Sequence, residues 1–176
     1  MKKLNLQQFN QVYQLFEKAF IPAELRPYEQ MKTLYNHHEF QIYTRIDNEQ
    51  LIAAMIVWEF DEFVYFENFA VDQKFRGQGI GSQFLKELQR FYADKLLILE
   101  VEKPFDEISE KRIQFYQRHQ WKLNPYEYIQ PLLRENEEDV HLQLMSYPNQ
   151  INNQQFQNIK NTLFKYVYKR RSSREY

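Results

Sequence analysis

The spacing of apolar side chains predicts that the chain begins with two helices. In residues 5–20 the apolar positions recur at helical spacing, at Phe9, Val12, Phe16 and Phe20. Because Asn5 can cap this helix and Pro22 interrupts it, we expect the helix to end near Phe20. Residues 21–27 then form a loop with a proline near each end, and residues 28–38 form a shorter second helix.

The next segments have the β-branched and aromatic content of strands. FQIYTRI and LIAAMIVWEF lie on either side of a polar turn at residues 47–50, which predicts a hairpin. FVYFENFAV, residues 63–71, is a third strand, and a helix with one apolar face follows at residues 82–93. LLILEVE, residues 96–102, has an apolar first half, typical of a central strand covered on both faces.

The rest of the chain alternates between helix and strand patterns. We expect a helix at residues 109–119, a polar loop with the sequence PYEYIQPLLRENEED, a strand at residues 140–145 and a last helix at residues 151–168. An apolar stripe on that helix is expected to pack on the domain or on another subunit. The basic tail, residues 169–176, is expected to be solvated. A length of 176 residues suits a single domain, residues 1–176.

Composition excludes several kinds of protein. The 23 basic and 24 acidic residues nearly cancel, which argues against a nucleic-acid-binding protein. The absence of cysteine excludes disulfides, thiolate metal sites and cysteine nucleophiles. His37 and His38 have no partner at metal spacing, so we expect no metal. No stretch reaches 18 apolar residues, and we therefore predict a soluble cytoplasmic protein that does not bind a membrane.

All three glycines lie in one short segment, RGQGIG, at residues 76–81. Average usage of about 7% would give about twelve glycines in a chain of this length. A glycine-rich turn before a helix exposes backbone N–H groups at the positive end of the helix dipole, which suits a phosphate. The alternative is a tight connection whose glycines serve packing.

The spacing of these glycines helps to distinguish which kind of phosphate-containing ligand the turn would bind. No Lys-Ser or Lys-Thr pair follows Gly81, which disfavours a P-loop nucleoside triphosphatase. Gly77, Gly79 and Ser82 nearly match a dinucleotide-binding motif, with Glu100 close to the expected ~20 residues further on. However, two helices and a hairpin precede the motif here, whereas a dinucleotide fold places it after its first strand.

Two blocks resemble the GNAT superfamily of acetyl-CoA-dependent N-acyltransferases. FENFAVDQKFRGQGIGSQFL is similar to that family's strand, glycine turn and following helix, and RIQFYQRHQW to its later tyrosine-containing block. The order of elements over residues 5–140 is also similar. The resemblance implies an α/β (α+β) single domain, with a mixed, mostly antiparallel central sheet that has a splayed strand pair and is flanked by helices.

The resemblance also implies a binding site for acetyl-CoA. The main chain of Phe69, Ala70 and Val71 would pair with the pantetheine arm, and nearby N–H groups would polarise the acetyl carbonyl. Ser109 stands where some relatives place a cofactor-binding asparagine. The coenzyme pyrophosphate would be held by the segment Arg76, Gly77, Gln78, Gly79, Ile80, Gly81 and Ser82.

By the same resemblance, two kinds of side chain would move protons. Glu100 is the first candidate for the base that accepts the amine proton, and Glu67 on the other splayed strand is the alternative. Glu102 shares a face with Glu100 and stays open as a third carboxylate. Tyr116 occupies the position of the tyrosine that assists the departing thiolate.

Some positions depart from the family pattern or stay ambiguous. Gln120 and Trp121 stand where relatives often have glycine and phenylalanine. Arg26 lies in the loop that borders the acceptor side in this family, but we expect an ordinary surface arginine there.

The sequence therefore predicts transfer of an acetyl group from acetyl-CoA to a primary amine of a small molecule or a protein. A coenzyme A-binding sensor or scaffold without turnover is the second hypothesis, because fold does not fix function. An NAD(P)-binding oxidoreductase is the third. A homodimer stays open.

Overall fold

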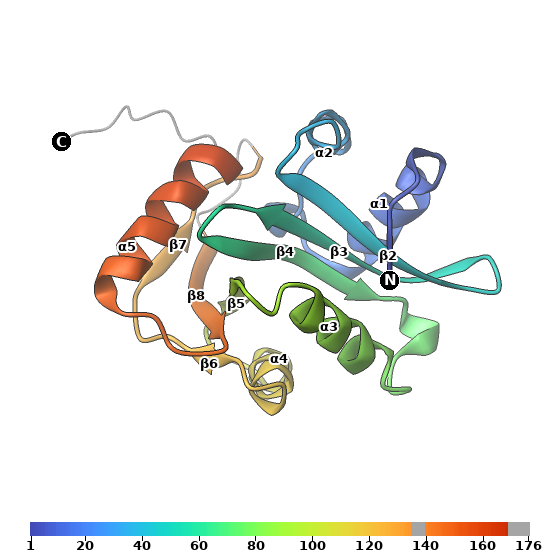
Figure 1. Ribbon diagram of the computed structural model, residues 1–176. Helices are drawn as coiled ribbons and strands as arrows, with labels where there is room; N and C mark the ends of the chain where they lie inside the picture. Colours follow the sequence, from blue (N-terminus) through green and yellow to red (C-terminus); the bar gives the residue numbers. More distant parts are fainter. Residues whose placement is uncertain (135–139, 169–176) are drawn as a thin grey trace. The chain divides into compact units, whose positions relative to one another are not determined.

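Strands that follow one another in the first part of the chain are also neighbours in its sheet (Figure 1). The order is β1 (Lys2–Lys3), β2 (Phe40–Asp47), β3 (Gln50–Glu59), β4 (Phe63–Val71) and β5 (Leu96–Glu102). The pairs from β1 to β4 are antiparallel, whereas β4 and β5 are parallel. This computed structural model describes residues 1–134 and 140–168, in two compact units, Met1–Leu99 and a second that begins at Glu100.

The predicted hairpin is present and turns without glycine. Strands β2 and β3 are joined by Asn48 and Glu49, which have φ values of 46° and 64°. Two successive residues with positive φ form the turn that matches the twist of a two-residue hairpin. Side chains at these two positions therefore tolerate the left-handed region, and the chain keeps its glycines for residues 76–81.

The N-terminal helices form largely where the apolar pattern predicts them. Asn5 caps a short 3-10 turn, η1 (Leu6–Gln8), through its side chain, and α1 (Phe9–Ala19) follows and packs on β3 and β4. The next connection contains the 3-10 turn η2 (Pro22–Glu24). Helix α2 (Tyr28–Leu34) ends four residues before the predicted boundary at residue 38. The Asn-His-His sequence after it favours a turn that leads into β2.

Helix α3 begins earlier than the apolar face predicts. It spans Ile80–Phe91, and Gly79 is its N-cap residue in the left-handed conformation. A 3-10 turn, η3 (Gln73–Phe75), leads from β4 towards this helix, and the Asp72 side chain caps that turn. Gly81 therefore lies inside the first turn of the helix. Phe84, Leu85 and Leu88 are the fully buried apolar positions of α3.

The second unit contains α4 (Glu107–Arg118), β6 (Lys122–Leu123), β7 (Tyr128–Gln130), β8 (Val140–Tyr147) and α5 (Asn153–Thr162). Strand β8 pairs antiparallel with both β6 and β7. A π-helical turn, η4 (Leu163–Val167), continues α5. The short strands β6 and β7 were missed by the sequence analysis, which predicted a loop for much of this region. The basic tail at 169–176 and loop residues 135–139 lie outside the described residues.

The predicted fold class is confirmed: a mixed α/β fold whose sheet is mostly antiparallel, with one parallel pair, and is flanked by helices. The assignment of residues 1–176 to a single domain stays a prediction. None of the helices in the described part of the chain has the length and apolar character needed to cross a membrane.

Candidate functional site

The glycine turn has the backbone geometry of an anion site. Gly77 and Gly79 both have φ of +77°, in the left-handed region that favours glycine. The N-cap residue of α3, Gly79, has no side chain and so provides no side-chain cap. Most helices satisfy one of their first backbone N–H groups with the side chain of the N-cap residue.

Packing does not account for these two glycines. A Cβ atom added at Gly77 or Gly79 would have no neighbouring atom within 4 Å among the described residues. Space therefore lies open beside the backbone at both positions. The conformation favours glycine, and the absence of a side chain leaves room for a ligand to approach the amides.

Polar side chains organise the approach to this turn. The Nε of Arg76 donates to the Val71 carbonyl at 3.0 Å, so the guanidinium folds back to the end of β4 while the residue stays exposed. Gln78 Nε2 donates to the Lys74 carbonyl at 3.3 Å. A positive charge is therefore held at the start of the open turn.

Strand β4 extends past its parallel partner. Within the described chain, β5 pairs with β4 from Phe63 and Leu96 only as far as Phe66 and Leu99. The main chain from Phe69 to Val71 is paired to β3 on its other edge. An edge without a neighbouring strand offers N–H and C=O groups to an extended ligand.

A β-bulge lies between these two parts of β4. Phe66 pairs with Val57 and Phe69 with Met55, so Glu67 and Asn68 together oppose one residue of β3. Bulges of this kind redirect side chains and are frequent beside active sites. Here the bulge directs the side chains of Glu67 and Asn68 towards the connection between α1 and α2.

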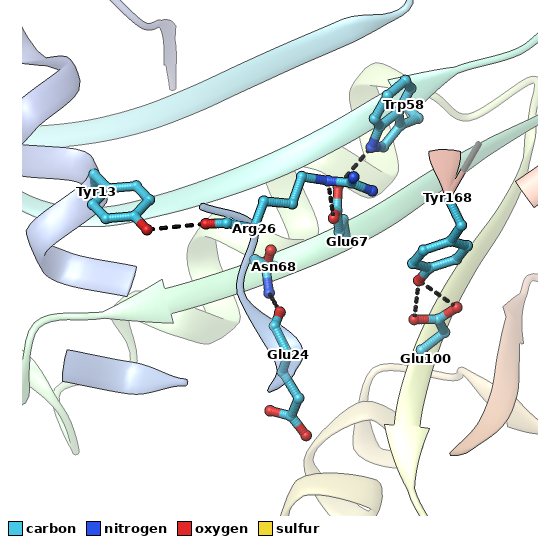
Figure 2. A network of polar contacts seen from close by, with 8 residues as sticks. All are labelled: Tyr13, Glu24, Arg26, Trp58, Glu67, Asn68, Glu100 and Tyr168. Atoms are coloured by element: carbon cyan, nitrogen blue, oxygen red, sulfur yellow. Dashed lines mark hydrogen bonds and ion pairs between the residues drawn. The ribbon is translucent and has the colours of Figure 1, made fainter. Parts of the chain in front are cut away.

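The Glu67 carboxylate is engaged on both oxygens (Figure 2). Arg26 Nε donates to one oxygen at 2.8 Å and Trp58 Nε1 donates to the other at 2.6 Å. Only 2% of the Arg26 side chain and 3% of the Glu67 side chain are exposed. The Arg26 guanidinium carbon also lies 5.6 Å from the centre of the Trp58 ring. The prediction of a surface arginine was wrong: Arg26 is buried because Glu67 compensates its charge.

The same connection is fixed at two further points. Asn68 Nδ2 donates to the Glu24 carbonyl at 3.2 Å, and Tyr13 donates to the Arg26 carbonyl at 2.9 Å (Figure 2). Asn68 Oδ1 is buried and has no hydrogen-bond partner among the described residues. The segment from Glu24 to Arg26 is therefore held to β4 by backbone and side-chain bonds.

In the second unit, the Glu100 carboxylate faces a tyrosine from the C-terminal end. The Tyr168 hydroxyl lies 2.9 Å and 2.8 Å from the two carboxylate oxygens and donates to them (Figure 2). The buried phenol of Tyr128 lies near enough to Glu100 to be affected by the negative charge of the carboxylate. Burial first, and then the charge of Glu100, raises the pKa of Tyr128 well above its ordinary value.

The third candidate carboxylate, Glu102, has a different partner. Arg112 donates to Glu102 at 2.6 Å, and both side chains are partly exposed. Glu100 and Glu102 are two residues apart on β5 and so project from the same face of the strand.

Tyr116 lies on α4 and packs against two rings, Phe115 and Trp121. Burial raises the pKa of the Tyr116 hydroxyl to about 12, and the positive charge of Arg112 offsets part of the effect. The phenol is therefore protonated across the physiological range, as a proton donor must be.

Ser109 has a structural task at the start of α4. Its backbone N–H donates to the Asp106 carboxylate at 2.7 Å, and its hydroxyl accepts from the Asp106 N–H at 3.1 Å. This reciprocal arrangement is a capping box. Capping lowers the pKa of Asp106. The capping box also explains why a serine is buried at this position, and the explanation needs no bound ligand.

The predicted site residues thus fall into two groups. The first unit holds Glu67, the main chain of Phe69 to Val71 and the turn from Arg76 to Ser82, and the second holds Glu100, Ser109 and Tyr116. The sequence analysis did not find Tyr168, although its position four residues after Phe164 on a helical stripe was a signal. The role of Arg26 was also missed, because a residue between two prolines gives no sign of burial.

The site thus combines a parallel strand pair, a strand that extends past its partner and a glycine turn at the N-terminus of a helix. Residues 9–121 match the acetyltransferase (GNAT) family, and the chain belongs to that family.

Individual relatives agree with this assignment. "Putative acetyltransferase YjbC" of Bacillus subtilis (strain 168) is 35% identical over 107 residues, which cover 57% of this chain and 54% of that protein. The match thus spans about half the length of this curated relative. A solved structure described as "Putative acetyltransferase from GNAT family" from Bacteroides thetaiotaomicron has a TM-score of 0.88 and 29% identity, and covers 95% of this chain and 97% of that one.

A more distant structure supports the fold alone. NAA60 of Arabidopsis thaliana, solved in complex with acetyl-CoA, has a TM-score of 0.64 at 15% identity, over 83% of this chain and 96% of that one.

Proposed function

We propose that this protein transfers the acetyl group of acetyl-CoA to a primary amine of a small molecule or a protein. The observation that carries the proposal is the turn at residues 76–82. It combines two glycines with positive φ, open space beside them and a helix N-terminus whose N-cap residue is a glycine. Family membership supports the same function. The cytoplasmic location and a homodimer remain predictions from sequence.

In this proposal the first unit binds the cosubstrate. The amides from Gly77 to Ser82 hold the pyrophosphate, whose negative charge suits the positive end of α3. Arg76 adds a positive charge beside them. The pantetheine arm lies along the edge of β4 at Phe69 to Val71, where it takes the place of a paired strand. No metal is needed for either contact.

The reaction moves one proton before the acetyl group is transferred and one after. The acceptor is an ammonium at neutral pH, because an alkyl amine has a pKa of about 10.4, and it must lose a proton to a carboxylate. Its nitrogen then attacks the thioester carbonyl carbon, and the carbon–sulfur bond breaks. We assign the first proton transfer to Glu100 as base, and the protonation of the departing thiolate to Tyr116. The surplus proton that the nitrogen still carries after the attack then returns to the Tyr116 phenolate, directly or through solvent, and Glu100 releases its proton to solvent.

The contacts favour Glu100 over Glu67 as the base. Both oxygens of Glu67 accept hydrogen bonds, one of them from a buried guanidinium. Accepting a further proton would break a buried ion pair, which is costly. Glu67 instead fixes the connection between α1 and α2. Ser109, whose N–H and hydroxyl form the cap of α4, stays a predicted contact of the cosubstrate.

The direct test is a screen of amines, with release of free thiol from acetyl-CoA as the readout. We expect turnover with at least one primary amine and a strong loss in Tyr116→Phe, with acetyl-CoA affinity retained. A binder without turnover would be stabilised by acetyl-CoA in thermal unfolding but release no thiol with any amine. Stabilisation by NAD(P) alone would replace the proposal by an oxidoreductase.

A further inference from the structure

The C-terminal end of the described chain places a tyrosine on the candidate base. Tyr168 follows directly on η4, sixty-eight residues away from Glu100 in sequence, and its hydroxyl reaches both carboxylate oxygens at 2.8–2.9 Å. The Tyr168 residue is only 9% exposed. This contact is more than a surface hydrogen bond, because Tyr168 is buried and Glu100 is partly buried.

The packing of the C-terminal helix fixes the position of Tyr168. Helix α5 starts with a capping box between Asn152 and Gln155. Its inner stripe is buried at Phe156, Ile159, Leu163 and Val167. The ring of Phe164 meets that of Tyr168 edge to face, with ring centres 6.5 Å apart. The phenol therefore cannot leave Glu100 by simple rotation of an exposed side chain.

The backbone just before Tyr168 is unusual. The N–H of Tyr168 donates to the Leu163 carbonyl, five residues earlier, at 2.9 Å. This π-helical turn shifts the angular position of Tyr168, compared with a continuous α-helix. Turns of this kind are rare overall, but those that do occur are often found at functional sites. Here the shift directs Tyr168 towards β5.

The groups around Glu100 determine how Tyr168 can affect the charge of the carboxylate. Tyr128 on β7 adds a second buried phenol, whose pKa is raised by burial and by its interactions with Glu100 and Tyr168. Glu102, on the same face of β5, is neutralised by Arg112 at 2.6 Å. A hydroxyl that donates to a carboxylate stabilises its charged form. A carboxylate has about four acceptor positions, so hydrogen bonds from phenols do not prevent it from taking a proton.

We infer that Tyr168 is a positioning residue for the base: its hydroxyl orients the Glu100 carboxylate and keeps it ionised, ready to accept the amine proton. The inference rests on the proposed function for its catalytic meaning. It assigns a task to the C-terminal helix, which carries this tyrosine to β5. The amine proton goes to Glu100, and Tyr168 keeps its own.

The test compares Tyr168→Phe with the wild type and with Tyr166→Phe. The phenylalanine keeps the ring that packs on Phe164 and removes only the hydroxyl. Tyr166 lies two residues earlier and is half exposed, so its variant controls for changes at this end of the chain. Thermal unfolding of the three proteins checks that all are folded.

The first readout is the pH dependence of kcat/KM for acetyl transfer. Without the hydroxyl, Glu100 takes up a proton more readily, so the acid limb of Tyr168→Phe should move to higher pH by about one unit. Activity below the limb should fall about tenfold, while the plateau at high pH is kept. The acceptor's own protonation is the same for all three proteins, so the difference between profiles isolates Tyr168.

The second readout does not depend on turnover. Glutamate labelled with 13C at the carboxyl carbon is followed by NMR during a pH titration, and Glu100→Gln identifies the Glu100 signal. We expect the titration midpoint of the Glu100 carboxyl to be about one pH unit higher in Tyr168→Phe than in the wild type or Tyr166→Phe.

The two readouts distinguish a failure of the inference about Tyr168 from a failure of the proposed function. Equal titration midpoints in Tyr168→Phe and the wild type overturn the inference, whether or not the protein turns over. A shifted midpoint with an unmoved acid limb also overturns it, because Glu100 would not limit the reaction. Absence of turnover in the wild type defeats the proposed function, while the titration still decides whether Tyr168 controls the charge of Glu100.

Discussion

Arg26 and Glu67 show how one buried ion pair determines local structure. Each has no more than 3% of its side chain exposed, and the carboxylate also accepts from Trp58. Glu67→Gln leaves the arginine without its carboxylate in a buried place. Removing one partner of such a pair typically costs about 3–5 kcal/mol. We expect a loss of about that size in the free energy of unfolding, measured by urea denaturation.

Glu107→Gln is the matched control for this prediction. Glu107 forms an exposed pair with Lys111 at 2.6 Å, and such pairs contribute about 0.5 kcal/mol or less. If Glu67→Gln were as stable as Glu107→Gln, the ion pair would not be what holds the connection between α1 and α2.

Tyr116 carries a prediction about chemistry. Tyr116→Phe should lower kcat by roughly 10²-fold or more, the usual contribution of a general acid, with little change in acetyl-CoA affinity. Because the pKa of the Tyr116 hydroxyl is raised to about 12, its ionisation should cause no loss of wild-type activity until the pH approaches that value. Steady-state kinetics and calorimetric titration measure the two quantities. A variant with full kcat would exclude Tyr116 as the acid.

At the scale of elements, the turn into α3 makes a separate prediction. Gly79→Ala forces a side chain into the left-handed region, which costs about 1–2 kcal/mol. Its Cβ would also project into the open space where the pyrophosphate is proposed to lie. We expect a lower Tm and an acetyl-CoA affinity reduced at least tenfold.

Lys86→Ala, an exposed change in the middle of α3, serves as the comparison and should alter neither quantity much. Should Gly79→Ala bind acetyl-CoA as tightly as Lys86→Ala, the turn would not be the anion site.

The elements could be predicted from the sequence where periodicity is strong. Strands β4 and β5 coincide with their predicted bounds, because β4 is rich in aromatic and β-branched residues and β5 begins with a wholly apolar run. Strands β6 and β7 are two and three residues long, too short to show a period of two. The end of α2 was also misplaced, because Tyr35 extends the apolar spacing of the helix beyond Leu34.

The candidate site also has parts that could be predicted from the sequence and parts that could not. The glycine turn was visible because its conformation demands a particular residue type. The contacts of Glu67 with Arg26, and of Glu100 with Tyr168, join residues 41 and 68 positions apart, so no local pattern reports them. The bulge that redirects Glu67 is likewise invisible, because it depends on the register with β3.

For the whole molecule, buried tyrosines predict loss of stability in alkali. Burial raises the pKa of Tyr43 to about 12, and that of Tyr116 to about 12, above the ordinary value of 10.0. A group whose pKa is raised in the folded state contributes its full stabilisation below pH 10 and loses it as the pH rises towards 12. The urea midpoint should therefore hold up to about pH 10 and fall above it.

Tyr43→Phe removes one of these groups and should reduce the alkaline fall, whereas the exposed Tyr166→Phe should leave it unchanged. A urea midpoint that stayed level from pH 9 to pH 12 would contradict the buried, neutral state of these phenols.

The central claim is that the turn from Arg76 to Ser82 holds the pyrophosphate of acetyl-CoA, and a crystal structure with acetyl-CoA in excess tests it most directly. The account predicts backbone nitrogens of Gly77 to Ser82 within about 3.2 Å of pyrophosphate oxygens, with the pantetheine arm beside Phe69 to Val71. Acetyl-CoA bound elsewhere on the protein, with this turn making no contact to its phosphates, would contradict it.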